Sequence, residues 1–358
     1  MDLLTHAVLG ATAGMAVAPR DLLRRGALVG ALAGVLPDAD VLIASAQDPF
    51  LVLEYHRHFS HSLVLAPAIA ALAAAIVAGA SALRSTLRST LRPTLRRNPD
   101  GAAARAPFAL LWRMALPAAF LAGLLDACTS YGTHLLWPFK DDPIAWSTIA
   151  VVDPLFTLMV VVPALIAFTR KRRRGALVAL VLGALYLAFG AVQHGRALDA
   201  ARALAVERGL DPAEVAVKPT LANLVLWRAL SIDGGHLHAD AVRVGLGRAV
   251  RIYTGERAPL VGPADAPDWA PAGSVAARDI ERFRGFARGL LVRDPRAPEH
   301  LGDARYAMSP TSLTPLWSIG PPIMGTAGSS TSGHATFTVR REIDAEGRAA
   351  LLDMLRGR

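Results

Sequence analysis

The chain has a single cysteine, Cys128, and only 19% of its 358 residues are charged and 6% aromatic. One cysteine excludes an intramolecular disulfide and a cysteine-based zinc site, so a metal would have to be bound by histidine and carboxylate side chains. The sequence also lacks a G-x-S-x-G element, a P-loop and the kinase signatures. No motif therefore indicates a serine hydrolase, a P-loop nucleotide-binding protein or a kinase.

Apolar residues are abundant instead. The chain is 53% hydrophobic with a mean hydropathy of +0.36, and its runs of Ala, Leu and Val approach bilayer length. This composition predicts an integral membrane protein. The net charge of +9 comes from arginine placed in short stretches between apolar runs, which is typical of a topology signal that also attracts anionic lipid. The expected partner is a lipid bilayer, and no nucleic acid is expected.

The apolar runs predict six spans, at about 3–19, 26–46, 61–82, 107–127, 149–169 and 175–194, of which the first is short and could be re-entrant. Composition turns polar near residue 201. Beyond that point the patterns predict helices at 196–208, 277–290 and 344–356, and strands at 236–244, 248–254 and 335–342. The expected fold is mainly α, a polytopic membrane helical bundle over residues 1–200 with a small extramembrane α+β domain over residues 201–358.

Basic residues follow every second span, at Arg20 to Arg25, at 84–97 and at 170–174. These loops are predicted to be cytoplasmic, which puts both termini and the C-terminal domain outside a bacterial inner membrane. The repeat RSTLRSTLRPTLRR at 84–97 is either an amphipathic surface segment or a low-complexity loop. The start Met1-Asp2 has no basic signal-peptide region, so His6 is expected in the mature protein.

This topology brings seven ionisable side chains to the outer ends of the spans. They are His6, Asp38, Asp40, His58, His61, Asp126 and Asp153. Aspartate and histidine near hydrocarbon are costly unless they are paired, bind a metal or reach water. Several at one depth therefore predict a metal site.

Local patterns suggest roles for these residues, each with a simpler alternative. Asp38 and Asp40 follow Pro37 two residues apart, and they converge only if the helix opens there; a helix break with solvated carboxylates is the alternative. His58 and His61 can share one helical face; an interfacial belt of aromatic and cationic residues is the alternative for this element. Arg57 is placed to grip an anionic group at two points.

We therefore expect His6, Asp38, His58, His61 and Asp126 to be metal ligands, Asp40 to be a ligand or general base, and Arg57 to be an anion clamp. Two structural alternatives stay open: His6 could be a core histidine, and Asp153 could be an N-cap before Pro154. It also stays open whether His134 or Asp153 joins the site.

Several elements resemble the YdjM/YbcI-like family of membrane-bound metal-dependent hydrolases. They are MDLLTHAVLGA, LPDAD, HRHFSHS (where the family usually reads H-R-G-x-T-H-S), LLDACTSYGTHLLWPF and VVDPLFTL. The resemblance implies a hydrolase distantly similar to zinc-dependent phospholipase C and P1-type nucleases. One departure concerns Ala122, which stands where many members have a histidine four residues before the acid that matches Asp126. A ligand is therefore missing, which affects the expected number of metals.

The sequence thus predicts a metal-dependent hydrolase that uses Zn²⁺, or Mn²⁺ given its oxygen-rich ligands, at the outer face of the membrane. A phosphoester, phospholipid or lipid-linked phosphate would suit a site at head-group depth. Two other classes remain. One is a non-catalytic metal-binding membrane protein, and the other is a transporter, which would carry polar residues near the bilayer midplane.

Overall fold

The computed structural model describes residues 1–45, 47–91, 106–323 and 333–358. The chain divides into two compact units. The first contains residues 1–40 and 57–189, and the second contains residues 41–56 and 190–358. Each unit is described by itself.

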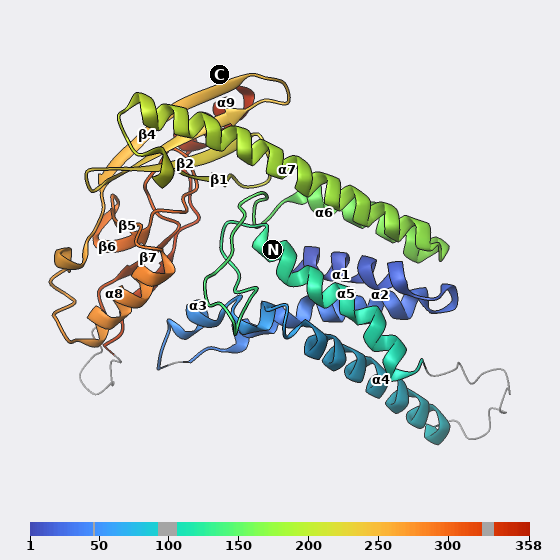
Figure 1. Cartoon of the computed structure of the whole chain (residues 1–358). Coiled ribbons are helices and arrows are strands. Elements are labelled where there is room, and N and C mark those ends of the chain that lie inside the picture. The colour runs from blue at the N-terminus through green and yellow to red at the C-terminus, as the bar shows by residue number, and fades with distance from the viewer. Residues whose placement is uncertain (46, 92–105, 324–332) are drawn as a thin grey trace. The chain divides into compact units, whose positions relative to one another are not determined.

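The first unit is helical (Figure 1). Its helices are α1 (Leu3–Val17), α2 (Leu23–Val35), α4 (Ala66–Leu91), α5 (Phe108–Ala127), α6 (Pro154–Arg170) and the first part of α7 (Arg173–Glu207). Helix α1 packs against α2, α5 and α6, and α2 packs against α4 and α5. The repeat at 84–97 is helical as far as Leu91, where α4 ends, and its remaining residues lie outside the described part of the chain.

Within the described residues, three helices are long and apolar enough to cross a membrane: α4 over Ala66–Leu87, α5 and α7. Helices α1 and α6 are apolar but shorter. Six spans are therefore not confirmed. The span expected at 26–46 is interrupted, because α2 ends at Val35 and a 3₁₀ helix, η2, runs from Leu36 to Leu42. Pro37 has no N–H for an α-helical hydrogen bond, which favours the break at this point.

Capping carboxylates begin two of the helices next to the site. Asp2 accepts a hydrogen bond from the backbone N–H of Thr5 at the start of α1. Asp153 accepts one from Phe156 at the start of α6 and another from the hydroxyl of Tyr186. Asp153 is therefore the N-cap of α6, the alternative that its position before Pro154 suggested.

Glycines set the spacing between α1 and α2. A Cβ atom at Gly10 would lie 2.3 Å from the carbonyl oxygen of Gly30, and one at Gly34 would lie 2.6 Å from that of His6. Only glycine permits backbones to approach so closely, as in the small-residue contacts of membrane helices. The contact brings the start of α1 beside the end of α2, and therefore His6 beside η2.

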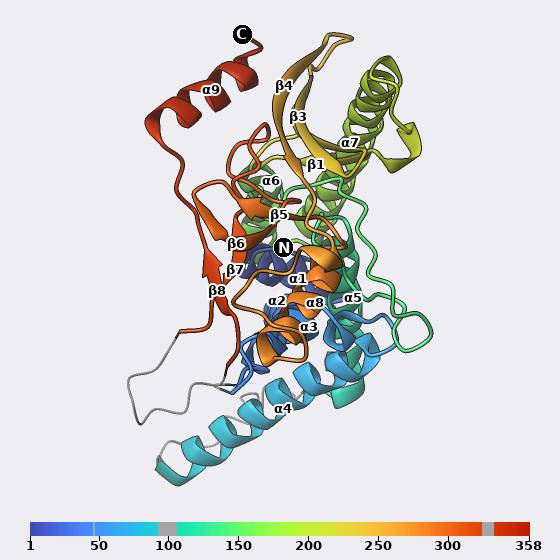
Figure 2. The same cartoon turned by 90° about the vertical axis from the view of Figure 1, so that its left-hand side faces the viewer.

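Within the described residues, the second unit has two antiparallel sheets, each of four strands. Several of the strands can be followed in Figure 2. The first sheet contains β1 (Ala216–Pro219), β2 (Leu226–Asp233), β3 (His236–Val244) and β4 (Val250–Pro259), in that order. The second contains β5 (Leu291–Asp294), β6 (Ala297–Asp303), β7 (Trp317–Gly320) and β8 (Thr336–Val339). Three helices were predicted from the sequence in this part of the chain. Those at 277–290 and 344–356 correspond to α8 (Val275–Phe286) and α9 (Ala345–Arg356), and the one at 196–208 forms the last part of α7. The strands predicted at 236–244, 248–254 and 335–342 correspond to β3, β4 and β8.

The segment 41–56 contains the short helix α3 (Leu51–Tyr55) and belongs to the second unit. Phe50 is 1% exposed in a core that includes Ile280 and Phe283 of α8. The guanidinium of Arg282 binds both carboxylate oxygens of Asp48 at 2.9 Å. Apolar burial and a two-point ion pair thus hold this segment to α8.

Candidate metal centre

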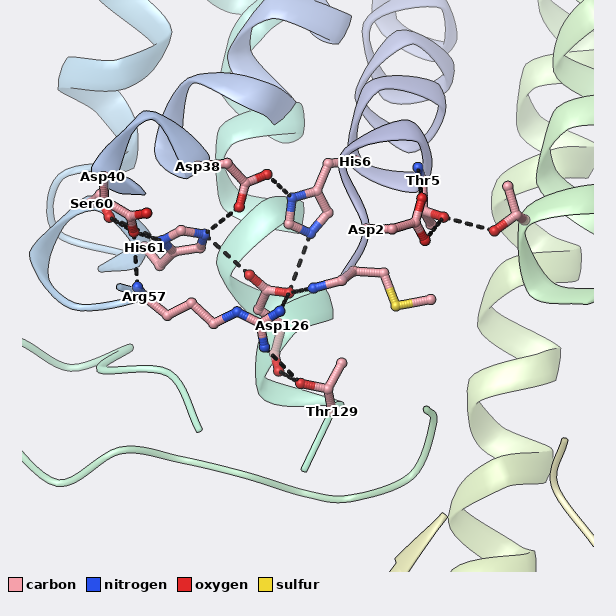
Figure 3. A network of polar contacts seen from close by, with 12 residues as sticks. Asp2, Thr5, His6, Asp38, Asp40, Arg57, Ser60, His61, Asp126 and Thr129 are labelled. Atoms are coloured by element: carbon pink, nitrogen blue, oxygen red, sulfur yellow. Dashed lines mark hydrogen bonds and ion pairs between the residues drawn. The ribbon is translucent and has the colours of Figure 1, made fainter. Parts of the chain in front are cut away.

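Four side chains from separate segments converge at one end of the first unit (Figure 3). His6 lies on the first turns of α1, Asp38 on η2, His61 on the 3₁₀ helix η3 (Phe59–His61) and Asp126 near the end of α5. Each offers a ligand atom within 4.8 Å of those of the others. The structure thus brings together residues up to 120 positions apart in the chain.

Two carboxylates bridge two imidazoles in this group. Asp38 lies 2.8 Å from Nδ1 of His6 and 3.5 Å from Nε2 of His61. Asp126 lies 3.4 Å from Nε2 of His6 and 3.1 Å from Nε2 of His61. Ligand atoms at roughly these separations can share an ion with bonds of about 2.0–2.2 Å. His6 faces carboxylates through both ring nitrogens, and only one of them can bind a given ion.

Burial distinguishes this group from a surface ion-pair cluster. The side chains of His6, His61 and Asp126 are fully buried, and that of Asp38 is 12% exposed. Among the described residues, Nε2 of His6 and Oδ2 of Asp126 form no hydrogen bond of good geometry, although they lie 3.4 Å from Oδ1 of Asp126 and 3.1 Å from Nε2 of His61. Buried polar atoms are normally well satisfied, so these imperfect contacts fit a bound cation.

Asp40 lies beside this group and holds His61 from the other side of its ring. Its Oδ2 is 3.3 Å from Nδ1 of His61 and accepts hydrogen bonds from the backbone N–H of Arg57 and the hydroxyl of Ser60, both at 2.8 Å. A carboxylate on the remaining nitrogen of a ligating imidazole fixes the orientation of the ring. These contacts do not test the two roles expected for Asp40, ligand or general base. They place its carboxylate at Nδ1 of His61, whereas Asp38 and Asp126 face Nε2 of the same ring.

Arg57 extends its side chain into the same region, where it is 3% exposed. Its Nη2 lies 3.3 Å from Asp126, its Nη1 donates to the hydroxyl of Thr129 at 2.9 Å, and the guanidinium stacks over the ring of Tyr131. The backbone of Arg57 has a φ of +59°, a conformation that is uncommon for a residue with a Cβ. The amino group of Met1 also forms an ion pair with Asp126.

The carboxylates affect the protonation of His61. Burial lowers the pKa of His61, but hydrogen bonds to Asp126, Asp38 and Asp40 outweigh burial and raise the pKa to about 10. The imidazole is therefore protonated at neutral pH when no metal is bound. A metal would displace this proton, so binding would release protons to the solvent.

His58 does not lie in this group, contrary to the sequence-based expectation. It lies with His134 and Asp141 in a second group. The prediction assumed that His58 and His61 share a helical face. In the structure the chain turns through the positive φ of Arg57 and η3 begins only at Phe59, so the two rings diverge.

Ala122, the position at which the family resemblance led us to expect a histidine, is buried on α5 one turn before Asp126. It supplies no ligand atom. Ser60, Thr129 and Asp141 were not predicted from the sequence, because their contacts join segments that are distant in sequence. For Asp141 the only local signal is a second acid, Asp142, beside it.

Apolar helices of membrane-spanning length, together with a buried His/Asp group, define a helical membrane protein with a candidate metal centre. The chain belongs to the YdjM inner membrane protein family, whose model matches residues 1–197. That range contains every residue of both His/Asp groups. No curated protein and no solved structure matches the chain.

Proposed function

We propose that this protein is a membrane-bound metal-dependent hydrolase. The observation that carries the proposal is the buried convergence of His6, Asp38, His61 and Asp126, whose ligand atoms all lie within 4.8 Å of one another. Two imidazoles and two carboxylates form a donor set that suits Zn²⁺, and also Mn²⁺. When bound, such an ion activates water and polarises a phosphoryl or acyl oxygen.

The chain's own residues would prepare the site for this chemistry. Asp40 orients His61 through Nδ1. Arg57 supplies a fixed positive charge 3.3 Å from Asp126, and its Nε is buried without a hydrogen-bond partner among the described residues. An oxyanion that approaches the ligands would therefore meet a preorganised cation. We propose that Arg57 receives the anionic group of the substrate.

We further propose that the site faces the extracytoplasmic side of an inner membrane. The starts of α1 and α6 lie together, since the hydroxyls of Thr5 and Thr157 are 2.7 Å apart. The basic stretches follow the opposite ends of these helices, at Arg20 and at Arg170. By the positive-inside rule those ends are cytoplasmic. A phospholipid or lipid-linked phosphate is the substrate class that suits this depth.

The test combines metal content with turnover. Full-length protein in detergent, loaded with Zn²⁺ or Mn²⁺, should hydrolyse at least one member of a panel of phosphoesters, phospholipids and acyl esters. Asp126→Asn should remove both metal and activity. Asp153→Asn is the matched control because Asp153 is equally buried but caps α6 outside the group, so it should keep the metal.

Two results would count against the hydrolase. Metal binding without turnover on any ester would favour a non-catalytic metal-binding protein. Turnover that persists in Asp126→Asn would show that the reaction does not depend on this group.

A further inference from the structure

A second group of potential ligands lies outside the centre described above. Nε2 of His58 and Nδ1 of His134 each lie 3.1 Å from the same carboxylate oxygen, Oδ1 of Asp141. The centroids of the two imidazole rings are 4.3 Å apart. The three ligand atoms lie within 4.8 Å of one another.

Backbone pairing between distant segments builds this group. The N–H of His134 donates to the carbonyl of Arg57 at 3.0 Å, which brings His134 next to the residue before His58. Thr133 and Ile144 exchange two backbone hydrogen bonds, at 3.0 and 2.9 Å, and so close the loop that carries Asp141. Two imidazoles and one carboxylate are thus held by main-chain contacts, which do not depend on the side chains that form the group.

This second group is more exposed to solvent than the first. The side chains of His58 and His134 are 18% and 19% exposed, and that of Asp141 is 75% exposed. The ring of Trp137 packs edge-on against His58, with centroids 5.9 Å apart, and covers one side of it. An ion here would have protein ligands on the inside and an open position toward solvent.

The members of this group do not belong to the first centre. His58 lies with His134 and Asp141, whereas His61, three residues further on, lies with His6, Asp38 and Asp126. The position of His58 is therefore not explained by the first centre. A surface histidine needs no such partner, yet this one faces a second imidazole and a carboxylate.

We infer that His58, His134 and Asp141 form a second, solvent-open binding site for a divalent transition-metal ion, with Zn²⁺ the best match. Two nitrogen ligands and one oxygen ligand form the set used by open zinc sites, which keep a position for water or an exogenous ligand. Donor atoms 3.1 Å from a common oxygen are near the separation that a tetrahedral ion with bonds of about 2.0–2.1 Å requires. The inference does not depend on hydrolysis at the first centre.

The competing explanation is an ionic cluster in which the imidazoles simply donate hydrogen bonds to Asp141. The two explanations differ in zinc stoichiometry. Full-length protein in detergent would be stripped with a chelator, titrated with Zn²⁺ and passed through gel filtration, and its zinc content measured. Co²⁺ titration, followed by its visible absorption, would report coordination independently of content.

We expect each variant to have a defined zinc stoichiometry. Asp141→Asn and His134→Ala should each bind one zinc equivalent fewer than the unmodified protein and lose one component of the Co²⁺ spectrum. Asp142→Asn is the matched control, an exposed neighbour outside the group, and should bind the full amount. His61→Ala should lose the other equivalent, and the double variant His61→Ala with His134→Ala should lose both.

The inference is overturned if Asp141→Asn keeps both the full zinc content and the full Co²⁺ spectrum. It is also overturned if His61→Ala alone removes all bound metal. Since the side chain of Asp141 is largely exposed and its loop is closed by backbone hydrogen bonds, Asp141→Asn should keep the fold even if His134→Ala does not. An unchanged circular dichroism spectrum and elution volume verify this.

Discussion

Asp40 Oδ2 lies 3.3 Å from Nδ1 of His61, while Nε2 of the same ring faces Asp38 and Asp126. One imidazole is therefore held between a positioning carboxylate and two potential co-ligands. This arrangement predicts that substitutions of Asp38 and Asp40 weaken metal binding to different extents, although the two residues are only two positions apart.

Asp40→Asn should weaken metal binding by about 10- to 100-fold without abolishing it, which is typical of losing a carboxylate that orients a ligating histidine. Asp38→Asn removes a ligand oxygen and should weaken binding more. Zinc affinity measured by competition with a chromophoric chelator distinguishes the two. Ser60→Ala leaves Asp40 its hydrogen bond from Arg57 and should have the smallest effect; equal losses in all three variants would contradict this ranking.

Arg57→Lys should keep the metal and lower turnover of an anionic substrate by tenfold or more, because lysine keeps the charge but not the planar fork of donors. Metal content and kcat/KM measured on the same preparation test this. Loss of metal in Arg57→Lys would mean that Arg57 supports the ligands rather than the substrate.

Gly34→Ala should destabilise the first unit by about 1–3 kcal/mol, because the new methyl group would lie 2.6 Å from the carbonyl oxygen of His6 and push α1 from α2. It should also lower metal affinity, since the two helices carry His6 and η2. Gly79→Ala is the matched control on α4, where a Cβ meets nothing within 4 Å. Thermal unfolding in detergent compares them, and equal melting temperatures would refute the close helix contact.

Asp48→Asn should destabilise the second unit by about 1 kcal/mol at neutral pH, the scale of a partly exposed ion pair. Hydrogen bonding from Arg282 lowers the pKa of Asp48 below its ordinary value of 3.8, so this stabilisation is present above that pH and is lost as pH falls below it. The difference in melting temperature between variant and wild type should therefore shrink in acid. Asp268→Asn, at an exposed position, should show no such pH-dependent difference.

A reporter that is active only outside the cytoplasm should work when fused after Arg358 and fail when fused near residue 97. By the positive-inside rule, the basic stretches predict that these points lie on opposite sides of the membrane. Reporter activity in whole cells is the measurement. The reverse pattern would put the metal centre on the cytoplasmic face.

Local sequence predicted the parts of the site that depend on helix ends. His6, Asp38, His61 and Asp126 each lie where an apolar segment begins or ends, so alternating topology was enough to bring them together. The position of His58 could not be predicted, because it depends on the positive φ of Arg57 and on a backbone hydrogen bond from His134, which is 76 residues further along the chain. The role of Asp40 depends likewise on the N–H of Arg57.

The fold, like the site, was predicted only where local sequence patterns are clear. Helices α8 and α9 and the long strands β3 and β4 follow clear periodic patterns, and they were predicted. Strands β1, β2, β5, β6 and β7 were not predicted. Strands β5 and β7 have four residues each, and short apolar runs do not by themselves distinguish strand from helix. Strand β2 has eight residues, but its first six are all buried, so it lacks the alternation that identifies a strand. The predicted span at 26–46 was too long, because hydropathy alone does not show that α2 ends at Val35, two residues before Pro37.

The segment 41–56 leaves the first unit at Asp40 and returns at Arg57, two residues joined by a hydrogen bond of 2.8 Å. Its ends are therefore fixed to each other whatever lies between them. Doubling the length of such a loop costs only about 0.6 kcal/mol in closure entropy. We expect insertions in this segment, away from Asp48 and Phe50, to leave the spacing of the ligands unchanged.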